Sequence, residues 1–122
     1  MKTYIVDTYA WIALTEGNKK FKQEIEESLL ETPIIVLCEL SKVLEKKKIE
    51  QKEKDKILDY VINNSLLIPF SQADAINSGR ISAKENLYLV DGIVYSYTSK
   101  EKPLLTGDKH FKGKPFVCLI EG

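Results

Sequence analysis

Residues 5–14 read Ile5-Val6-Asp7-Thr8-Tyr9-Ala10-Trp11-Ile12-Ala13-Leu14, one apolar run that passes through an aspartate into a second apolar run. Residues 2–6 predict a short buried strand, and residues 9–14 predict a helix that Gly17 ends. Asp7 therefore lies at the carboxyl end of the first expected strand. A buried strand followed at once by a helix is typical of an α/β protein.

The alternation of strand-like and helix-like patterns continues along the chain. Apolar spacing predicts helices over residues 19–31 and 52–64, and another helix that follows the apolar run 33–36 and continues through residue 44. Ser71, with Asp74 three residues later, predicts the capped start of a further helix. A last helix is expected over residues 90–99, and strands are expected over residues 66–70, 103–106 and 116–120. Short apolar strands between helices favour a central parallel sheet covered on both faces, so we expect one three-layer α/β/α domain spanning residues 1–122.

The composition is that of a folded globular protein without overall attraction for nucleic acid. The chain has 122 residues, of which 43% are hydrophobic, and its 18 basic and 18 acidic residues give a formal net charge of zero. Any binding of RNA would therefore need a local basic patch. Cys38 and Cys118 each lie in an apolar run, which favours two buried free thiols over a disulfide or a metal–thiolate site. No apolar run approaches the roughly 20 residues of a membrane span and no signal-peptide pattern opens the sequence, so we expect a cytoplasmic protein.

Two aspartates follow expected strands at their carboxyl ends. Asp7 comes directly after the first strand, and Asp108 lies two residues after the strand over residues 103–106. In open parallel sheets, ligands bind at this edge. For either aspartate alone, capping of the turn that follows is the simpler explanation.

Two further carboxylates lie on apolar helix faces. Glu39 is one turn after Ile35, and Asp91 is one turn before Val94 and Tyr95. A carboxylate in such a place costs several kcal/mol unless a cation compensates it. Neither helix offers a basic residue on the same face, so a bound metal ion is a better compensator than a lysine or arginine.

These four carboxylates indicate a particular class of metal. Asp7, Glu39, Asp91 and Asp108 supply only oxygen ligands, which favour Mg²⁺ or Mn²⁺ over zinc. Two such ions about 4 Å apart can activate water and stabilise the leaving oxygen in phosphodiester hydrolysis. This chemistry needs no protein nucleophile, and the sequence offers no convincing nucleophile triad.

At these residues the sequence resembles the PIN-domain family, in particular the VapC-type toxins of toxin–antitoxin pairs. The similarity extends from residue 3 to residue 120. Tyr9 and Tyr95 are bulkier than the small residues usual at those positions, and residues 71–90 match only loosely. The matching motifs are the opening strand with Asp7-Thr8, the glutamate in Val36-Leu37-Cys38-Glu39-Leu40, the aspartate that begins Asp91-Gly92-Ile93-Val94, and the turn Thr106-Gly107-Asp108-Lys109-His110-Phe111.

The resemblance implies a PIN-like fold whose sheet brings the four carboxylates together, and a metal-dependent endoribonuclease activity. It also implies an antitoxin partner and a homodimer, for which Trp11 is a candidate anchor if it is not a core residue. One alternative is a PIN fold without catalysis that serves as an RNA-binding or assembly module. A more distant alternative is a phosphoacceptor receiver domain, which needs an acidic pair near the first strand and a lysine after the last strand. The chain has neither feature.

Other polar residues near the motifs have two interpretations each. Thr8 and Thr106 either donate hydrogen bonds to the ligating carboxylates or cap local turns. His110, the single histidine, is expected to be a surface residue rather than a catalytic base. Five lysines around the fourth motif either guide the RNA backbone or form an ordinary solvated face: Lys100, Lys102, Lys109, Lys112 and Lys114.

Overall fold

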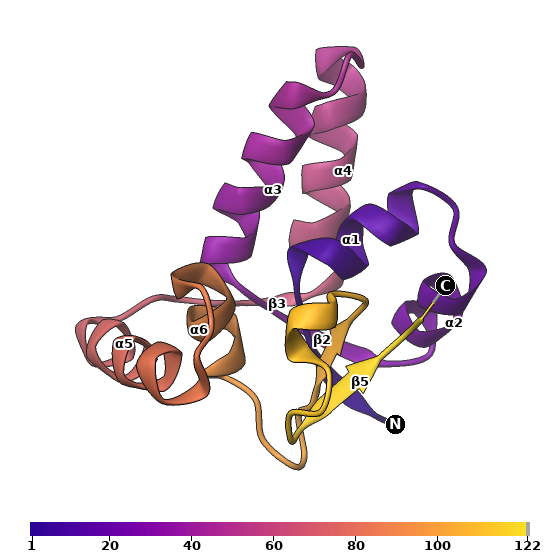
Figure 1. The fold of residues 1–122 in the computed structure, drawn as a ribbon. Coiled ribbons are helices and arrows are strands. Elements are labelled where there is room, and N and C mark those ends of the chain that lie inside the picture. The colour runs from indigo at the N-terminus through magenta and orange to yellow at the C-terminus, as the bar shows by residue number, and fades with distance from the viewer. Residues whose placement is uncertain (122) are drawn as a thin grey trace.

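The computed structural model describes residues 1–121, and within them five strands form one sheet accompanied by helices (Figure 1). The strands are β1 (Thr3–Val6), β2 (Leu29–Pro33), β3 (Leu66–Ile68), β4 (Leu104–Thr106) and β5 (Val117–Leu119). The α-helices are α1 (Thr8–Thr15), α2 (Lys19–Glu26), α3 (Ile34–Lys46), α4 (Gln51–Asn64), α5 (Gln72–Glu85) and α6 (Leu89–Tyr95). A short 3-10 helix, η1 (Lys109–Phe111), follows β4.

The sheet is parallel throughout, with the strand order β3-β2-β1-β4-β5. This arrangement confirms the expected α/β/α fold with a central parallel sheet. Strand β1 lies in the middle, where Ile5 has Glu31 on one side and Leu104 on the other. Because β1 and β4 are neighbours and run in the same direction, the residues that follow them meet at one edge of the sheet.

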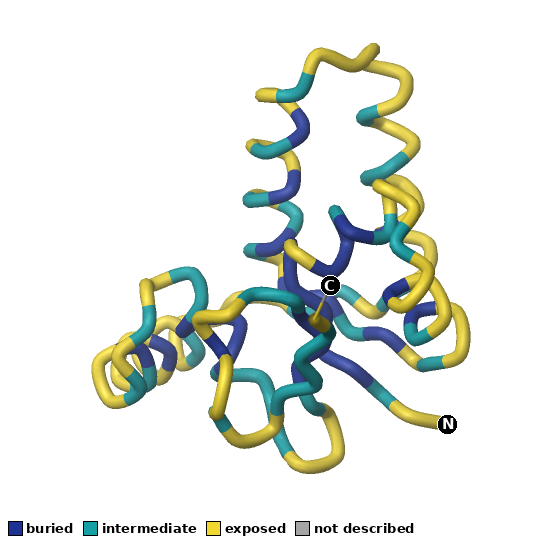
Figure 2. Tube along the Cα trace, turned by 45° about the vertical axis from the view of Figure 1, so that its right-hand side comes forward, coloured by how far each residue is buried: buried dark blue, intermediate teal, exposed yellow. Residues whose placement is uncertain are grey.

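The core surrounds the two central strands. Ile5, Val6, Leu104 and Leu105 are fully buried, as fits strands enclosed on both faces (Figure 2). Trp11 is also fully buried, and its indole nitrogen donates a hydrogen bond to Thr32 Oγ1 at 3.3 Å. Trp11 is therefore a core residue and is not free to anchor a dimer.

Two boundaries differ from the expectation at the second strand. The helix expected over residues 19–31 ends at Glu26, and Leu29 to Pro33 form β2 instead. Leu29 continues the helical spacing of Phe21 and Ile25 by coincidence, while Leu30 is held by parallel pairing with Tyr4 of β1. Pairing between distant segments overrides the local period, and Pro33 ends the strand immediately before α3.

Other expectations need smaller corrections. The helix expected over residues 90–99 ends at Tyr95, and tight turns follow, with Tyr97 N donating to Val94 O and Thr98 N to Tyr95 O. Cys38 is exposed and not buried, because it lies on α3 beside Glu39 and points away from the core. Cys118 is partly buried, and both cysteines are free thiols.

Helices α5 and α6 pack closely on one side of the molecule (Figure 1). The expected capping box at the start of α5 is present: Ser71 Oγ accepts from Asp74 N, and Asp74 Oδ2 accepts from Ser71 N, both at 3.1 Å. The close approach of the two helices depends on Gly92 of α6. A Cβ atom on Gly92 would lie 1.7 Å from Ser82 Oγ and 2.9 Å from Ser82 Cα.

Helices α3 and α4 form a long hairpin whose tip extends beyond the sheet (Figure 1). The tip is exposed, whereas the part of α3 near the sheet buries Val36 and Leu40 (Figure 2). Glu39 lies in this sheet-proximal part. Among residues 1–121, none of the helices has the length and apolar character needed to cross a membrane.

The Gly92 contact leads to a stability prediction. Gly92→Ala should lower the free energy of unfolding by about 1–3 kcal/mol, because a buried Cβ atom has no room beside Ser82. Gly79→Ala on the exposed face of α5 is the matched control, since a Cβ atom added there would have no neighbour within 4 Å. The control should be neutral or more stable by up to about 1 kcal/mol. Urea unfolding of both variants measures the difference, and equal stability would contradict the packing argument.

Candidate active site

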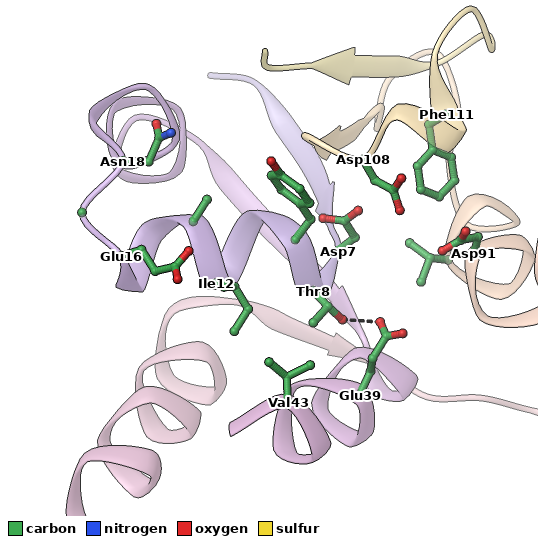
Figure 3. A pocket seen from close by; sticks show the side chains of 14 residues that line it. Asp7, Thr8, Ile12, Glu16, Asn18, Glu39, Val43, Asp91, Asp108 and Phe111 are labelled. Atoms are coloured by element: carbon green, nitrogen blue, oxygen red, sulfur yellow. Dashed lines mark hydrogen bonds between the residues drawn. The ribbon is translucent and has the colours of Figure 1, made fainter. Parts of the chain in front are cut away.

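Four carboxylates line one cavity at the carboxyl edge of the sheet (Figure 3). The cavity has a volume of about 620 Å³. Asp7 follows β1, Asp108 follows β4, and Glu39 and Asp91 come from α3 and α6. The structure thus brings together all four carboxylates singled out in the sequence, although they come from widely separated parts of the chain.

Asp7 lies at the start of α1 and is the most buried of the four, with 7% of its surface exposed. Its Oδ1 caps the helix by accepting from Ala10 N at 2.9 Å, and its Oδ2 accepts from the Thr106 hydroxyl. Burial, with smaller contributions from the charges of Asp108 and Asp91, raises the pKa of Asp7 to about 7 against the lowering effect of the hydrogen bonds from Thr106 and Ala10. Asp7 therefore both caps α1 and belongs to the carboxylate cluster.

Asp91 lies in the first turn of α6 and is half-buried. Burial raises the pKa of this carboxyl group, and the charges of Asp108 and Glu39 add to the increase, while His110 opposes it. Asp91 is thus held beside other negative charges at a low-dielectric wall. This arrangement favours a cation in the cavity.

Glu39 is fixed by the residue that follows Asp7. The hydroxyl of Thr8 donates to Glu39 Oε1, which links the start of α1 to α3 (Figure 3). Thr106 makes the corresponding link between β4 and Asp7, and its oxygen also accepts from Asp108 N at 3.0 Å. Both threonines therefore donate to carboxylates of the cluster, and Thr106 also caps the turn at Asp108, so both expected interactions are present for Thr106.

His110 lies closer to the carboxylates than a surface histidine was expected to lie. Its side chain is 55% exposed, yet its Nδ1 atom is 3.3 Å from Asp108 Oδ1 and 3.4 Å from Asp91 Oδ2. Ligand atoms of Asp91, Asp108 and His110 all lie within 4.8 Å of one another. The exposure of His110 fits the expected surface residue, and its place two residues after Asp108 already put it near that carboxylate, but its contact with Asp91 was not predicted.

The five lysines do not gather around the cavity. Lys102 pairs with Glu31 at 2.7 Å, Lys112 with Glu121 at 3.6 Å and Lys114 with Glu85 at 3.4 Å. Lys100 and Lys102 precede β4, so they lie toward the amino edge of the sheet, opposite the carboxylates. Only Lys109, on η1, immediately follows a cluster residue in sequence.

Tyr9, whose bulk departs from the family pattern, is part of the cavity wall, and so are residues that the sequence did not single out. Tyr9 lines it with half of its surface exposed, and its ring lies against the backbone of Gly107, where a Cβ atom would be 2.2 Å from Tyr9 Cε1. Glu16 and Asn18, between α1 and α2, form another part of the wall. No local pattern identifies them, because only the return of the chain after α1 brings them to the site. The remaining lining residues are Thr8, Ile12, Ala13, Gly17, Val43, Val94 and Phe111.

The donor set of the cavity fits a divalent metal ion. In the described part of the chain, none of the four carboxylates forms an ion pair with a lysine or arginine; Asp91 and Asp108 contact only His110. The negative charge is therefore left without a protein cation. Carboxylate oxygens without thiolates suit Mg²⁺ or Mn²⁺. Asp91 and Asp108, with His110, have ligand atoms within 4.8 Å of one another, while Asp7 and Glu39 line the same cavity outside this group.

The raised pKa of Asp7 predicts how stability depends on pH without metal. Between about pH 4 and pH 7, the folded protein keeps a proton that the unfolded chain releases, so the free energy of unfolding falls as the pH rises through this window. Asp7→Asn keeps an acceptor for the helix cap and removes the charge, so its stability should fall less steeply and should match or exceed that of the wild type at about pH 8.

Thermal unfolding in chelator across this pH range tests the prediction. Asp59→Asn, at an exposed position on α4, is the control and should follow the wild-type curve. A steep fall that persists in Asp7→Asn would show that other groups cause the pH dependence.

Comparison with known proteins agrees with this geometry. A family model described as PIN domain matches residues 4–117. A toxin–antitoxin complex from Klebsiella pneumoniae has a chain with 21% identity and a TM-score of 0.77, and the match covers 98% of this chain and 99% of that one. VapBC2 from Rickettsia felis, bound to a promoter DNA fragment, has 19% identity, a TM-score of 0.73 and 98% coverage of both chains.

VapBC-5 from Mycobacterium tuberculosis has 18% identity, a TM-score of 0.67 and full coverage of both chains. A comparison with curated proteins gave no match. At these identities the structural likeness establishes the fold, while the family model spans most of the sequence. The chain belongs to the PIN domain family.

Proposed function

We propose that this protein is a metal-dependent endoribonuclease of the VapC type, the toxin of a toxin–antitoxin pair. The observation that carries the proposal is the convergence of Asp7, Glu39, Asp91 and Asp108, from four separate elements, on one cavity at the carboxyl edge of a parallel sheet. Clustered carboxylates without a basic partner destabilise a protein. Their presence in one cavity is explained by a cation that they bind.

The chemistry follows from this donor set. A divalent ion, Mg²⁺ or Mn²⁺, supplies Lewis acidity and activates water at neutral pH. Asp91 and Asp108 both contact the imidazole of His110. Asp7 and Glu39 each accept a hydrogen bond from a threonine hydroxyl. Hydrogen bonds from Thr8 and Thr106 reduce the freedom of Glu39 and Asp7, which preorganises the oxygens that would meet a cation.

The cavity suits an accessible phosphodiester. It is lined by both polar and apolar side chains, and Tyr9 exposes half of its surface at the cavity wall. Single-stranded or loop RNA can present a phosphate with its neighbouring bases splayed, whereas a regular duplex cannot. Lys109, which immediately follows Asp108, would attract the RNA backbone, so activity should fall as salt concentration rises.

The biological setting is proposed from the structural neighbours. Several chains similar to this one come from structures named as toxin–antitoxin or VapBC complexes. An antitoxin encoded as a separate chain would be the regulatory partner. Because the proposed substrate is RNA, the protein would act in the cytoplasm. The cavity of carboxylates supports nuclease chemistry independently of these structural neighbours.

The central test is RNA cleavage. Wild-type protein with Mg²⁺ or Mn²⁺ should cut single-stranded or loop RNA internally, and chelator should abolish cleavage. Glu39→Gln should lower the rate by about 100-fold or more, because a neutral amide replaces one charged group of a preorganised site. End-labelled RNA substrates resolved on gels measure both effects.

A matched control lies on the same helix. Glu45→Gln makes the same chemical change on α3 and loses a surface ion pair with Lys54, at a cost of less than about 1 kcal/mol, so it should cleave normally. Equal cleavage by wild type and Glu39→Gln would identify the activity as a contaminant. Binding of RNA by both proteins without cleavage by either would favour the alternative function, a catalytically inactive RNA-binding or assembly module.

We also propose that the protein is a homodimer through the α5–α6 side of the fold. Trp11 is buried and does not support this interface, but Ile76 of α5 and Leu89 of α6 are more than half exposed, and Tyr88 beside Leu89 is 74% exposed. These exposed apolar side chains lie on or next to two helices that pack against each other, and exposed apolar patches are typical of interaction sites.

Light scattering should therefore report about twice the chain mass of 13.9 kDa at micromolar concentration. Leu89→Lys should shift the protein to the monomer, while Ile62→Lys, an equally polar change at an exposed position on α4, should leave the dimer intact. A wild-type monomer would refute the dimer, and dissociation by Ile62→Lys alone would move the interface to α4.

A further inference from the structure

We infer that His110 is a nitrogen ligand of the metal site and makes the site select Mn²⁺ over Mg²⁺. The inference rests on the metal site of the proposed function, but it changes the donor set from carboxylates alone to carboxylates and one imidazole. His110 is the only histidine in the chain, so its role can be isolated from that of every other residue.

The geometry of His110 matches that of a ligand better than that of a hydrogen-bond donor. Its Nδ1 atom lies 3.3 Å from Asp108 Oδ1 and 3.4 Å from Asp91 Oδ2, longer than a good N–H···O hydrogen bond of about 2.9 Å. Neighbouring donor atoms around an octahedral ion with bonds of about 2.1 Å are about 3 Å apart. The two distances from His110 Nδ1 are therefore close to those between neighbouring donors of one ion, and the ligand atoms of all three side chains lie within 4.8 Å of one another.

The surrounding structure holds the imidazole in this place. The backbone nitrogen of His110 donates to Asp108 Oδ1 at 2.9 Å, which fixes the turn that carries both residues. The ring of Tyr88 meets the imidazole edge to face, with the ring centres 5.3 Å apart. Tyr88 precedes α6, the helix that carries Asp91, so the same segment orients two of the three donors. More than half of the His110 side chain is exposed, which leaves room for the water ligands that small dications retain.

The selectivity follows from ligand chemistry. Mg²⁺ strongly prefers oxygen ligands and gains little from an imidazole, whereas transition-metal dications bind imidazole nitrogen well. Loss of one nitrogen ligand should therefore weaken Mn²⁺ binding far more than Mg²⁺ binding. The expected change is about tenfold or more for Mn²⁺, comparable to the effect of removing a supporting group from a metal site.

The experiment combines calorimetry with pulsed electron paramagnetic resonance of Mn²⁺, on the whole chain without an affinity tag, at about pH 8. Wild-type Mn²⁺ spectra should show the modulation of a directly coordinated ¹⁴N nucleus. Protein grown with ¹⁵N-imidazole histidine should show the ¹⁵N pattern instead, and this isotope comparison needs no variant. In calorimetry, His110→Gln should lose Mn²⁺ affinity by about tenfold or more, with Mg²⁺ affinity changed by less than about threefold.

The outcomes separate this inference from the proposed function. Mn²⁺ binding without nitrogen modulation, or with unchanged affinity in His110→Gln, overturns the ligand assignment but leaves the carboxylate site intact. Failure of the wild type to bind Mn²⁺ overturns both the ligand assignment and the metal-dependent function. Nitrogen modulation in a protein that cleaves no RNA supports the ligand assignment and refutes the nuclease.

Discussion

The hydrogen bond from Thr106 to Asp7 joins the two central strands at the point where the site begins. A carboxylate as buried as Asp7 must have its oxygens satisfied within the protein, and its two partners come from β4 and from the first turn of α1. Ala10 is a local partner, but Thr106 reaches Asp7 only because β1 and β4 are parallel neighbours, so the hydrogen bonding of Asp7 depends on the topology of the sheet. Thr106 also accepts from Asp108 N, so the same hydroxyl positions the second aspartate at this edge.

The two helical carboxylates are added to this edge by contacts of different kinds. Glu39 is reached by a polar contact, the hydroxyl of Thr8, and this contact also sets the orientation of α3 against α1. Asp91 depends on packing, because α6 is short and is positioned by its close contact with α5 at Gly92. A hydrogen bond therefore positions Glu39, and helix packing positions Asp91, at the same cavity. Both contacts keep the carboxylates close together despite their electrostatic repulsion.

Much of this arrangement could be predicted from the sequence, and the errors have physical causes. Asp7 and Asp108 follow apolar strands, so the edge they share follows from parallel pairing alone. Glu39 and Asp91 were recognisable because a carboxylate interrupts an apolar helix face. The second strand was misread as helix, since Leu29 fits a helical period that only pairing of Leu30 with Tyr4 overrides. The contacts of His110 with Asp91 and of Tyr9 with Gly107 could not be predicted, because they join residues that no local pattern relates.

The contact between Gly92 and Ser82 has a consequence for how sequences of this fold can change. These two positions share a space that holds one small side chain, and the shared space sets the distance between α5 and the helix that bears Asp91. A larger residue at one position demands a smaller one at the other. Among relatives, positions 82 and 92 are therefore expected to co-vary in size, although neither side chain lines the cavity. Substitutions at positions 82 and 92 would affect the active site only by shifting the backbone of α6, which carries Asp91.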